Sequence, residues 1–393
     1  MSESPIQNLR VHIYGAQGSG SVFPSRAERL ALLRHANQEL VACIIQDLSR
    51  HLDPQGRLSG TIEDILEGPI SPRTIARYAG RFDVTEPRVY GGWTTCVRVT
   101  TADGFEIVLD CGSGFRICAR DLQAQWAELP ERHLHLFGSH SHLDHTEGFD
   151  QAAVCFDPRN HLHIYGNRQF LRALDYNLGI FSRQVARAAQ GVQTPIHFGL
   201  MPATFASYEI GALPAAEADG PPLKSVALRA EEAIHLGATT ILPFEVFHPA
   251  PCLAYRIERE GRVFVFCTDH EWRREAGEDA EWRRSQVAED RLIAYATGAD
   301  LLYRDGQYLR AEYEGLKGIG DSGAVPRIGW GHSCIEDVVE MARKARIHRT
   351  LIGHHDPNRS WSELNWLDES ISRHGATDGC SVELARAETE FDL

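Results

Sequence analysis

The stretch HLFGSHSHLDHTEGF, residues 135–149, places three histidines and one aspartate within six positions, directly after an apolar run. His140 and His142 alternate along an extended segment, so their imidazoles can converge on one metal ion. Asp144 and His145 follow one turn later and can serve a second ion. Because one short loop rarely completes a metal site, the remaining ligands must come from other parts of the chain.

Composition restricts the class of protein. The chain has 393 residues, which fits one large α/β domain with an insertion or two domains. No stretch approaches the about 20 consecutive apolar residues of a membrane span, and the N-terminal segment MSESPIQNLRVHIYG lacks a signal-peptide pattern. The nine cysteines include no CxxC pair and indicate reduced thiols. We therefore expect a cytoplasmic protein without a membrane anchor.

The net charge narrows the choice of partner. A formal charge of −14 disfavours a nucleic acid polymer, because such partners are held mainly through positive charge. A small anionic substrate stays compatible with this charge, since a bound metal ion can invert the local field.

The chain alternates between helical and strand-like segments. An opening strand runs into a turn with Gly15, Gly18 and Gly20, which lacks the features of a phosphate-binding loop and predicts a tight active-site turn. Residues 26–84 have apolar residues at helical spacing and predict a helical insertion, either a packing or dimer element or a lid over a substrate cleft. From residue 88 the pattern is α/β.

Later strands end on chemically useful side chains. His248 follows the run FEVF, Asp269 follows FVFCT, and His354 follows TLIG. Any one of these residues could be purely structural. Together they stand where sites in α/β sheets form, at the carboxyl ends of strands, and Asp269 can bridge two cations. They are therefore the predicted missing ligands.

These segments together resemble a known family. SHSHLDH, preceded by LDCGSG and followed by an isolated histidine, by TDHE and by HHDP, resembles the metallo-β-lactamase superfamily of dinuclear metallohydrolases. The resemblance implies an α/β fold, the αββα sandwich, here a single domain over residues 1–393 with the helical insertion 26–84 within it. It also implies two divalent metal ions as cofactors; the ligand types favour Zn²⁺, and Mn²⁺ is compatible.

The resemblance assigns the ligands. Seven side chains would hold the two ions: His140, His142, Asp144, His145, His248, Asp269 and His354. The first ion takes the two leading histidines of the motif and the isolated histidine. The second takes Asp144, His145 and His354, and Asp269 bridges the two ions. His355 competes with His354, because a slip of one residue would exchange them.

A further motif indicates the branch of the family. Gly331-His332-Ser333 opens the segment GHSCIEDVVEMARKA and is similar to the His-Ser-Thr motif of the phosphodiesterase branch, although Cys334 replaces the threonine. The resemblance implies that His332 assists the leaving oxygen and that Asp305, in LLYRDGQY, orients it. Two alternatives stay open: His332 as the cap of its own helix, and Asp305 as a strand-end turn residue.

The expected catalytic residues are Asp144, His332 and Asp305. In the expected mechanism two cations neutralise a phosphodiester and activate a water as hydroxide, and His332 protonates the leaving alkoxide as general acid. We thus expect a metal-dependent hydrolase, a phosphodiesterase for a small anionic phosphodiester such as a cyclic nucleotide. The alternatives are hydrolysis of a non-phosphate ester or lactone, which would not need His332, and tRNA 3′-processing, which the acidic chain disfavours. A homodimer is also expected.

Overall fold

The computed structural model describes residues 6–82, 90–184, 194–211, 223, 225–274, 277–375 and 379–393. The chain divides into two compact units, one made of Met1–Phe23 with Val89–Leu393 and the other of Pro24–Arg88. The expected insertion, residues 26–84, falls in the second unit, and its last two residues lie outside the described ones. The single domain over residues 1–393 stays a prediction.

The first β-sheet of the larger unit has eight strands in the order β15-β1-β2-β3-β4-β5-β6-β7. From β3 onward neighbouring strands are parallel, whereas β1 pairs antiparallel with both β2 and β15. The strands are β1 (Leu9–Gly15), β2 (Cys96–Thr101), β3 (Glu106–Leu109), β4 (Arg132–Phe137), β5 (Asn160–Gly166), β6 (Thr204–Ile210), β7 (Ser225–Leu228) and β15 (Thr389–Asp392).

The second sheet has seven strands in the order β14-β13-β12-β11-β10-β9-β8. Strands β8 to β11 pair antiparallel, and β11 to β14 are parallel. Its strands are β8 (Ile234–Leu236), β9 (Thr239–Val246), β10 (Cys252–Arg259), β11 (Arg262–Cys267), β12 (Leu301–Asp305), β13 (Arg349–Gly353) and β14 (Ser381–Leu384).

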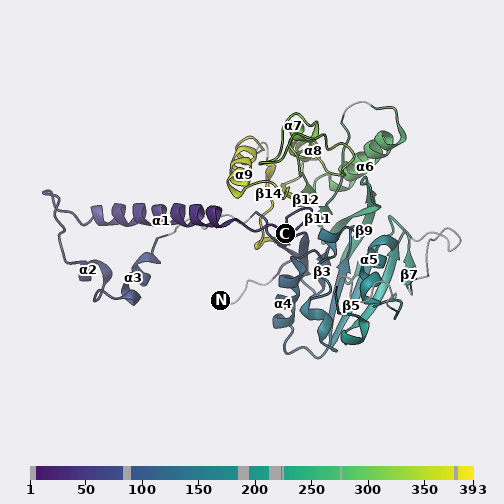
Figure 1. Cartoon of the computed structure of the whole chain (residues 1–393). Coiled ribbons are helices and arrows are strands. Elements are labelled where there is room, and N and C mark those ends of the chain that lie inside the picture. The colour runs from purple at the N-terminus through teal and green to yellow at the C-terminus, as the bar shows by residue number, and fades with distance from the viewer. Residues whose placement is uncertain are drawn as a thin grey trace. The chain divides into compact units, whose positions relative to one another are not determined.

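Helices cover the outer face of each sheet (Figure 1). The first sheet carries α4 (Phe115–Gln125) and α5 (Arg168–Leu178). The second carries α6 (Ala280–Ala296), α8 (Ile335–Lys344) and α9 (Trp361–Gly375), and the short α7 (Arg310–Tyr313) lies in the loop after β12.

The layers follow from the alternation of side chains along the strands. Leu134 and Leu136 of β4 face the helices, whereas Phe137 faces the second sheet. In that inter-sheet core Val99 of β2 belongs to the same buried cluster as Phe264 of β11. Because successive strand residues point to opposite faces, apolar runs of this kind need cover on both sides. The expected αββα sandwich is therefore confirmed.

The two sheets bring their strand ends to one edge. Asp110 follows β3, the histidine-rich segment follows β4, and Phe247 and His248 follow β9. Asp269 stands two residues beyond β11, whereas Asp305 is the last residue of β12 and His354 follows β13. A 3-10 turn, η1 (Leu143–His145), ends the histidine-rich segment, and two further 3-10 turns are η2 (Ala153–Phe156) and η3 (Phe198–Leu200).

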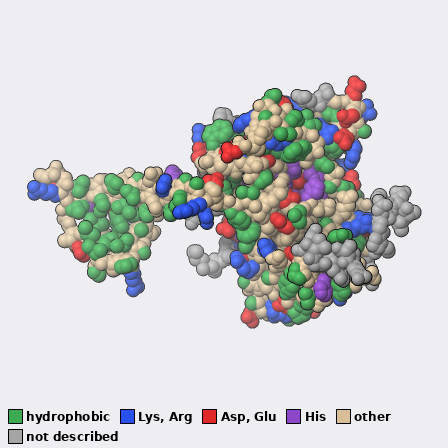
Figure 2. Space-filling view, viewed as in Figure 1, with side chains coloured by type: hydrophobic (Ala, Val, Ile, Leu, Met, Phe, Trp, Pro, Cys, Tyr) green, Lys and Arg blue, Asp and Glu red, His purple; other side chains and the backbone are tan. Residues whose placement is uncertain are grey.

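The smaller unit is helical, with α1 (Arg26–Ser49), α2 (Ile62–Leu66) and α3 (Pro72–Ala79). Its α1 begins with a capping box in which Ser25 and Glu28 satisfy each other's backbone amides. Among the described residues of this unit few are buried, namely Ile65, Leu66 and Tyr78. Hydrophobic side chains spread over the face shown in Figure 2. In the described parts of the chain, none of the helices has the length and apolar character needed to cross a membrane.

Candidate metal centre

The seven predicted ligands come together at the edge where the strands end, in two groups. In the first, ligand atoms of His140, His142, His248 and Asp269 all lie within 4.8 Å of one another. In the second, the same holds for Asp144, His145 and His354. Segments separated by up to 214 positions in the chain, from His140 to His354, thus converge on one place.

The first group is built from β4, β9 and β11. His248 Nε2 lies 3.2 Å from His142 Nδ1. Asp269 Oδ2 lies 3.4 Å from His140 Nε2 and 3.9 Å from His248 Nε2. His142 is exposed, whereas the other three side chains are buried, so this group is open toward solvent on one side.

The second group shares Asp269 with the first. Asp144 Oδ2 lies 3.3 Å from His145 Nε2 and 3.2 Å from His354 Nε2. Asp269 Oδ1 lies 3.3 Å and 3.2 Å from the same two nitrogens. Since Oδ2 of Asp269 faces the first group and Oδ1 the second, its carboxylate has the arrangement expected of a bridge between two ions.

The donor atoms fit divalent metal ions. His140 Nε2 and His145 Nε2 are buried and have no hydrogen-bond partner, although buried polar atoms are normally paired. Both nitrogens point into clusters of imidazole and carboxylate ligands, the donor set that Zn²⁺ and related ions prefer. The cluster of histidines and aspartates is therefore a candidate site for divalent metal.

Burial and neighbouring charges shift the pKa values of the ligand side chains. Burial lowers the pKa of His140 well below its usual value and that of His248 to about 4, so both rings are neutral, the form that binds metal. Burial also opposes charge on His145, but the carboxylates around it, foremost Asp144, raise its pKa well above the usual value. Burial alone would raise the pKa of Asp269, yet the surrounding histidines, foremost His354, hold it well below its ordinary range.

Two of the ligand rings are oriented by partners that sequence reasoning missed. Asp110 Oδ2 lies 2.7 Å from His145 Nδ1, and Asp110 also accepts hydrogen bonds from the backbone amide and hydroxyl of Ser139. Gln307 Oε1 lies 3.0 Å from His354 Nδ1. Because each acceptor takes the Nδ1 hydrogen, Nε2 is the nitrogen that faces the metal site, where a metal ion would replace its proton.

His248 has a backbone partner, since its Nδ1 lies 3.0 Å from the carbonyl oxygen of Gly331. The turn that contains Gly329 and Gly331 is held by the buried carboxylate of Glu271. This carboxylate accepts hydrogen bonds from the backbone amides of both glycines and from the Tyr313 hydroxyl. In the sequence, Asp110 stands in the motif LDCGSG and Gln307 in RDGQY. Neither motif indicates which histidine the side chain contacts.

The glycine-rich turn after β1 belongs to this site, as expected for an active-site turn. The backbone amide of Ser19 donates to Asp144 Oδ2 at 2.7 Å. A Cβ atom at Gly18 would lie 2.2 Å from His354 Nδ1, so only glycine fits against that ring.

The structure distinguishes the roles of His354 and His355. His354 faces both aspartates, whereas His355 Nε2 donates to the carbonyl oxygen of Ala385 at 2.8 Å. His354 has φ of 57°, a left-handed conformation that redirects its side chain relative to the strand before it.

His332 and Asp305 are brought together beside the ligands. His332 Nδ1 lies 3.1 Å from Asp305 Oδ2 and 3.9 Å from Asp269 Oδ2, and the His332 ring stacks on His354 at 4.4 Å between centroids. Asp305 is buried and also accepts from the amide of His270. The alternative of a helix cap is wrong for His332, because the N-cap residue of α8 is Cys334.

Comparison with known proteins gives the family. A protein-family model described as the β-lactamase superfamily domain matches residues 106–355. No curated protein is similar enough in sequence to match. Among solved structures, a diphosphatase of the PhnP family is similar at 14% identity, with 98% of each chain covered and a TM-score of 0.48. The short form of human tRNase Z is similar at 12% identity, with 97% of this chain and 98% of that chain covered and a TM-score of 0.49.

Zn²⁺-bound PqqB from Methylobacterium extorquens is similar at 12% identity, with 98% of this chain and 100% of that chain covered and a TM-score of 0.47. These three similarities do not identify a substrate. The family match, in contrast, spans more than half of the chain. The chain therefore belongs to the β-lactamase superfamily, as a hydrolase of the metallo-β-lactamase fold with a candidate histidine and aspartate metal-binding cluster.

Proposed function

We propose that the protein is a phosphodiesterase that uses two divalent ions, Zn²⁺ or Mn²⁺, to hydrolyse a small phosphodiester such as a cyclic nucleotide. The observation that carries this proposal is the pair of His332 and Asp305, 3.1 Å apart and next to both ligand groups. Ligand atoms of Asp269, His332 and His354 also lie within 4.8 Å of one another, but the two groups described above hold four and three donors without His332. We therefore assign this histidine, with its carboxylate partner, to proton transfer.

Phosphodiester cleavage needs such a residue. The alkoxide that leaves when the P–O bond breaks is strongly basic, so its departure is slow unless a proton is supplied. His332 is proposed as the general acid that gives this proton to the leaving oxygen. Asp305 accepts a hydrogen bond from Nδ1 of the ring and so holds its orientation, with Nε2 free to face the substrate.

The other proposed roles follow from the ligand geometry. When bound, two divalent ions supply positive charge that neutralises the phosphate oxygens and acidity that activates a water. Asp269 holds the two ligand groups in one unit through its two oxygens. Asp144, predicted as both ligand and catalytic residue, presents Oδ2 to His145 and His354 while the amide of Ser19 fixes that oxygen.

The test is a substrate panel with metal-loaded protein. It contains bis-p-nitrophenyl phosphate, four cyclic nucleotides, a 3′-extended tRNA precursor, and an ester and a lactone, each with wild type and His332→Ala. We expect turnover of a cyclic nucleotide to be about 10²–10⁴-fold lower in the variant and that of bis-p-nitrophenyl phosphate to fall less, because its leaving group is weakly basic. Both proteins should retain their metal. Turnover of the ester or lactone alone, equally fast in both proteins, would make His332 structural, and loss of metal in the variant would make it a ligand.

We also propose a homodimer formed through α1. Leu33, Val41 and Ile45 of this helix are 57%, 52% and 61% exposed and share one helical face. Arginines dominate the first half of α1, and its second half carries Glu39 and Asp47. An antiparallel pair of α1 helices from two copies would therefore bury the apolar face and match opposite charges. Ile45→Lys should yield monomers in sedimentation experiments; a wild-type monomer at all concentrations contradicts the proposal.

A further inference from the structure

A cavity of about 400 Å³ opens directly beside the metal centre and has His248 in its wall. Its other walls come from the first turn of α5, from the end of β6, from β9 and β10 and from α6. Three arginines line it, namely Arg168, Arg172 and Arg284, together with two carboxylates, Glu209 and Glu245. A substrate held at His248 thus has a space beside it in which further groups can lie.

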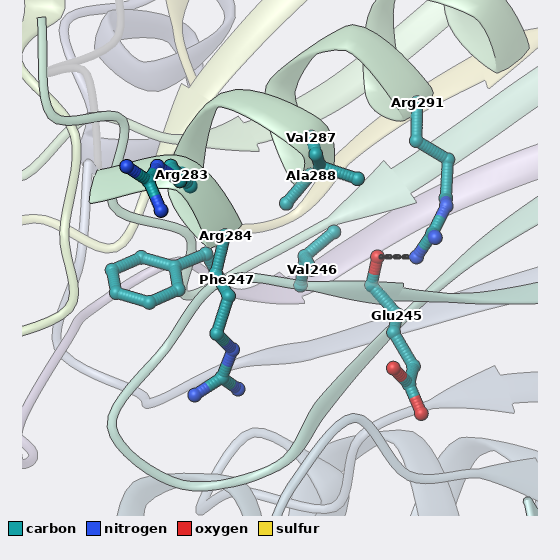
Figure 3. Close-up of a pocket in the computed structure, with 8 residues that line it drawn as sticks. All are labelled: Glu245, Val246, Phe247, Arg283, Arg284, Val287, Ala288 and Arg291. Atoms are coloured by element: carbon teal, nitrogen blue, oxygen red, sulfur yellow. Dashed lines mark hydrogen bonds between the residues drawn. The ribbon is translucent and has the colours of Figure 1, made fainter. Parts of the chain in front are cut away.

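A second, smaller hollow of about 270 Å³ adjoins this cavity and shares Glu245, Val246 and Arg284 with it. Arg283 and Arg291 of α6 add two more guanidinium groups there. Figure 3 shows Arg284 extending from α6 past Phe247, while Arg291 reaches the backbone oxygen of Glu245 at 3.1 Å. The two spaces together are lined by five arginines and two glutamates, in a chain whose net charge is −14.

The charges of these arginines are not all neutralised. Arg168 pairs with Glu209 at 2.7 Å and Arg291 with Glu231 at 3.1 Å. Within the described residues, Arg283 and Arg284 form no ion pair, and both side chains are exposed. Most surface arginines are solvated and bind no ligand. Arg284 differs because it lines the same cavity as the buried His248.

Arg284 is also partly oriented. Its guanidinium carbon lies 5.7 Å from the centroid of the Phe247 ring, and that of Arg273 lies 5.1 Å from the same ring. Phe247 immediately precedes His248 and is buried, so the ring is fixed relative to the metal centre. A cation–π contact restricts the guanidinium without neutralising it, and its N–H groups stay available to a ligand.

We propose that this cavity binds a second anionic group of the substrate, a phosphate monoester or diphosphate, while the scissile phosphodiester lies at the metal centre. Guanidinium groups recognise phosphate through paired N–H donors, which matches Arg284 and its neighbours. This inference rests on the proposed phosphodiesterase function and narrows it: a cyclic mononucleotide has one phosphate and leaves the cavity unused, so the preferred substrate carries phosphate at two positions.

The test compares ligands that differ in one phosphate. Thymidine 5′-(p-nitrophenyl phosphate) is assayed with and without a 3′-phosphate, and binding of thymidine 3′,5′-bisphosphate and thymidine 5′-monophosphate to metal-loaded protein is measured by calorimetry. We expect wild type to prefer the ligands with the second phosphate by about tenfold or more in both measurements, the scale of one charge-assisted hydrogen bond. Arg284→Gln should reduce this preference at least fivefold. Arg120→Gln, the same change at an exposed arginine of α4, is the control and should retain it.

The outcomes separate this inference from the proposed function. No preference for the second phosphate in wild type, or an equal preference in Arg284→Gln, overturns the cavity as a phosphate site even if the diesters are hydrolysed. If neither diester is hydrolysed but the binding preference exists and needs Arg284, the site stands and the phosphodiesterase proposal fails. If a tRNA precursor shows the dependence on Arg284 and the small ligands do not, the second phosphate belongs to a polymer and the proposal of a small substrate is overturned.

Discussion

The metal centre and the arginine-lined cavity meet at His248 but are built differently. In the metal centre the side chains are buried apart from His142, and His145, His248 and His354 each have a partner at Nδ1 that fixes the ring. In the cavity Arg284 is exposed, and its contact among the described residues is with the Phe247 ring. This difference fits the two proposals, in which residues at rigid strand ends carry out the chemistry and a long, exposed side chain on a helix selects the substrate.

The largest expected effect comes from the residue common to both ligand groups. Asp269→Ala removes the two oxygens that face His140 and His145 and leaves their nitrogens without the shared carboxylate. We expect activity on every substrate to fall by about 10³-fold or more, with loss of bound metal. Elemental analysis beside the rate assay checks this. Full metal content in Asp269→Ala would show that the ions, if two bind, are not bridged there.

His332→Ala comes next, and its effect should depend on the leaving group. A general acid matters most when the leaving oxygen is strongly basic. We therefore expect a loss of about 10²–10⁴-fold for a cyclic nucleotide and a clearly smaller loss for bis-p-nitrophenyl phosphate. Rates for a series of phosphodiesters with increasingly basic leaving groups measure the dependence. Equal losses across the series would assign His332 to substrate positioning instead.

The partners that orient the ligands should affect metal affinity more than folding. Asp110→Asn preserves the shape of the side chain, and asparagine tolerates the positive φ of 60° at this position. It weakens the hydrogen bond that orients His145, so we expect metal affinity to fall by about 10–100-fold. Competition with a chelator measures this in both proteins. An unchanged affinity would show that Asp110 serves the fold rather than the metal.

Arg284→Gln tests the cavity without changing the metal centre. Because the guanidinium of Arg284 contacts no predicted ligand, we expect metal affinity to stay within about twofold of wild type while the preference for a second phosphate is lost. Competition with a chelator measures the metal affinity, and the ligands with one and two phosphates measure the phosphate preference. A drop in metal affinity would mean that the cavity and the centre are not separate.

The smallest effect is expected at His355. His355→Gln retains a donor for the carbonyl oxygen of Ala385, so metal content should be unchanged and stability lower by only about 1 kcal/mol. The matched change His354→Gln should remove metal from the group with Asp144. Metal analysis and thermal unfolding of the two variants measure these effects. Loss of metal in His355→Gln but not in His354→Gln would make His355 the ligand.

Much of the fold was predictable from local patterns. The apolar runs before His248, Asp269 and His354 became β9, β11 and β13, because alternating buried faces demand strands. The sequence also favours helix over about residues 167–192; α5 lies in this segment, and residues 185–192 lie outside the described ones. The C-terminal segment, which the motifs of the family resemblance do not cover, forms α9, β14 and β15. Short edge strands such as β15 depend on pairing with β1, a contact 380 positions away in the chain that no local pattern reveals.

The sequence by itself determined the type of site: strand ends that carry histidine or aspartate supply metal ligands wherever the strands lie in one sandwich. Only the tertiary structure decided which donor meets which ligand. Asp110 reaches His145, Gln307 reaches His354, and Arg284 lines the cavity at His248, because packing of distant segments sets these contacts. The positive φ at His354 likewise chose between two adjacent histidines, since backbone conformation at a strand end is imposed by the surrounding fold.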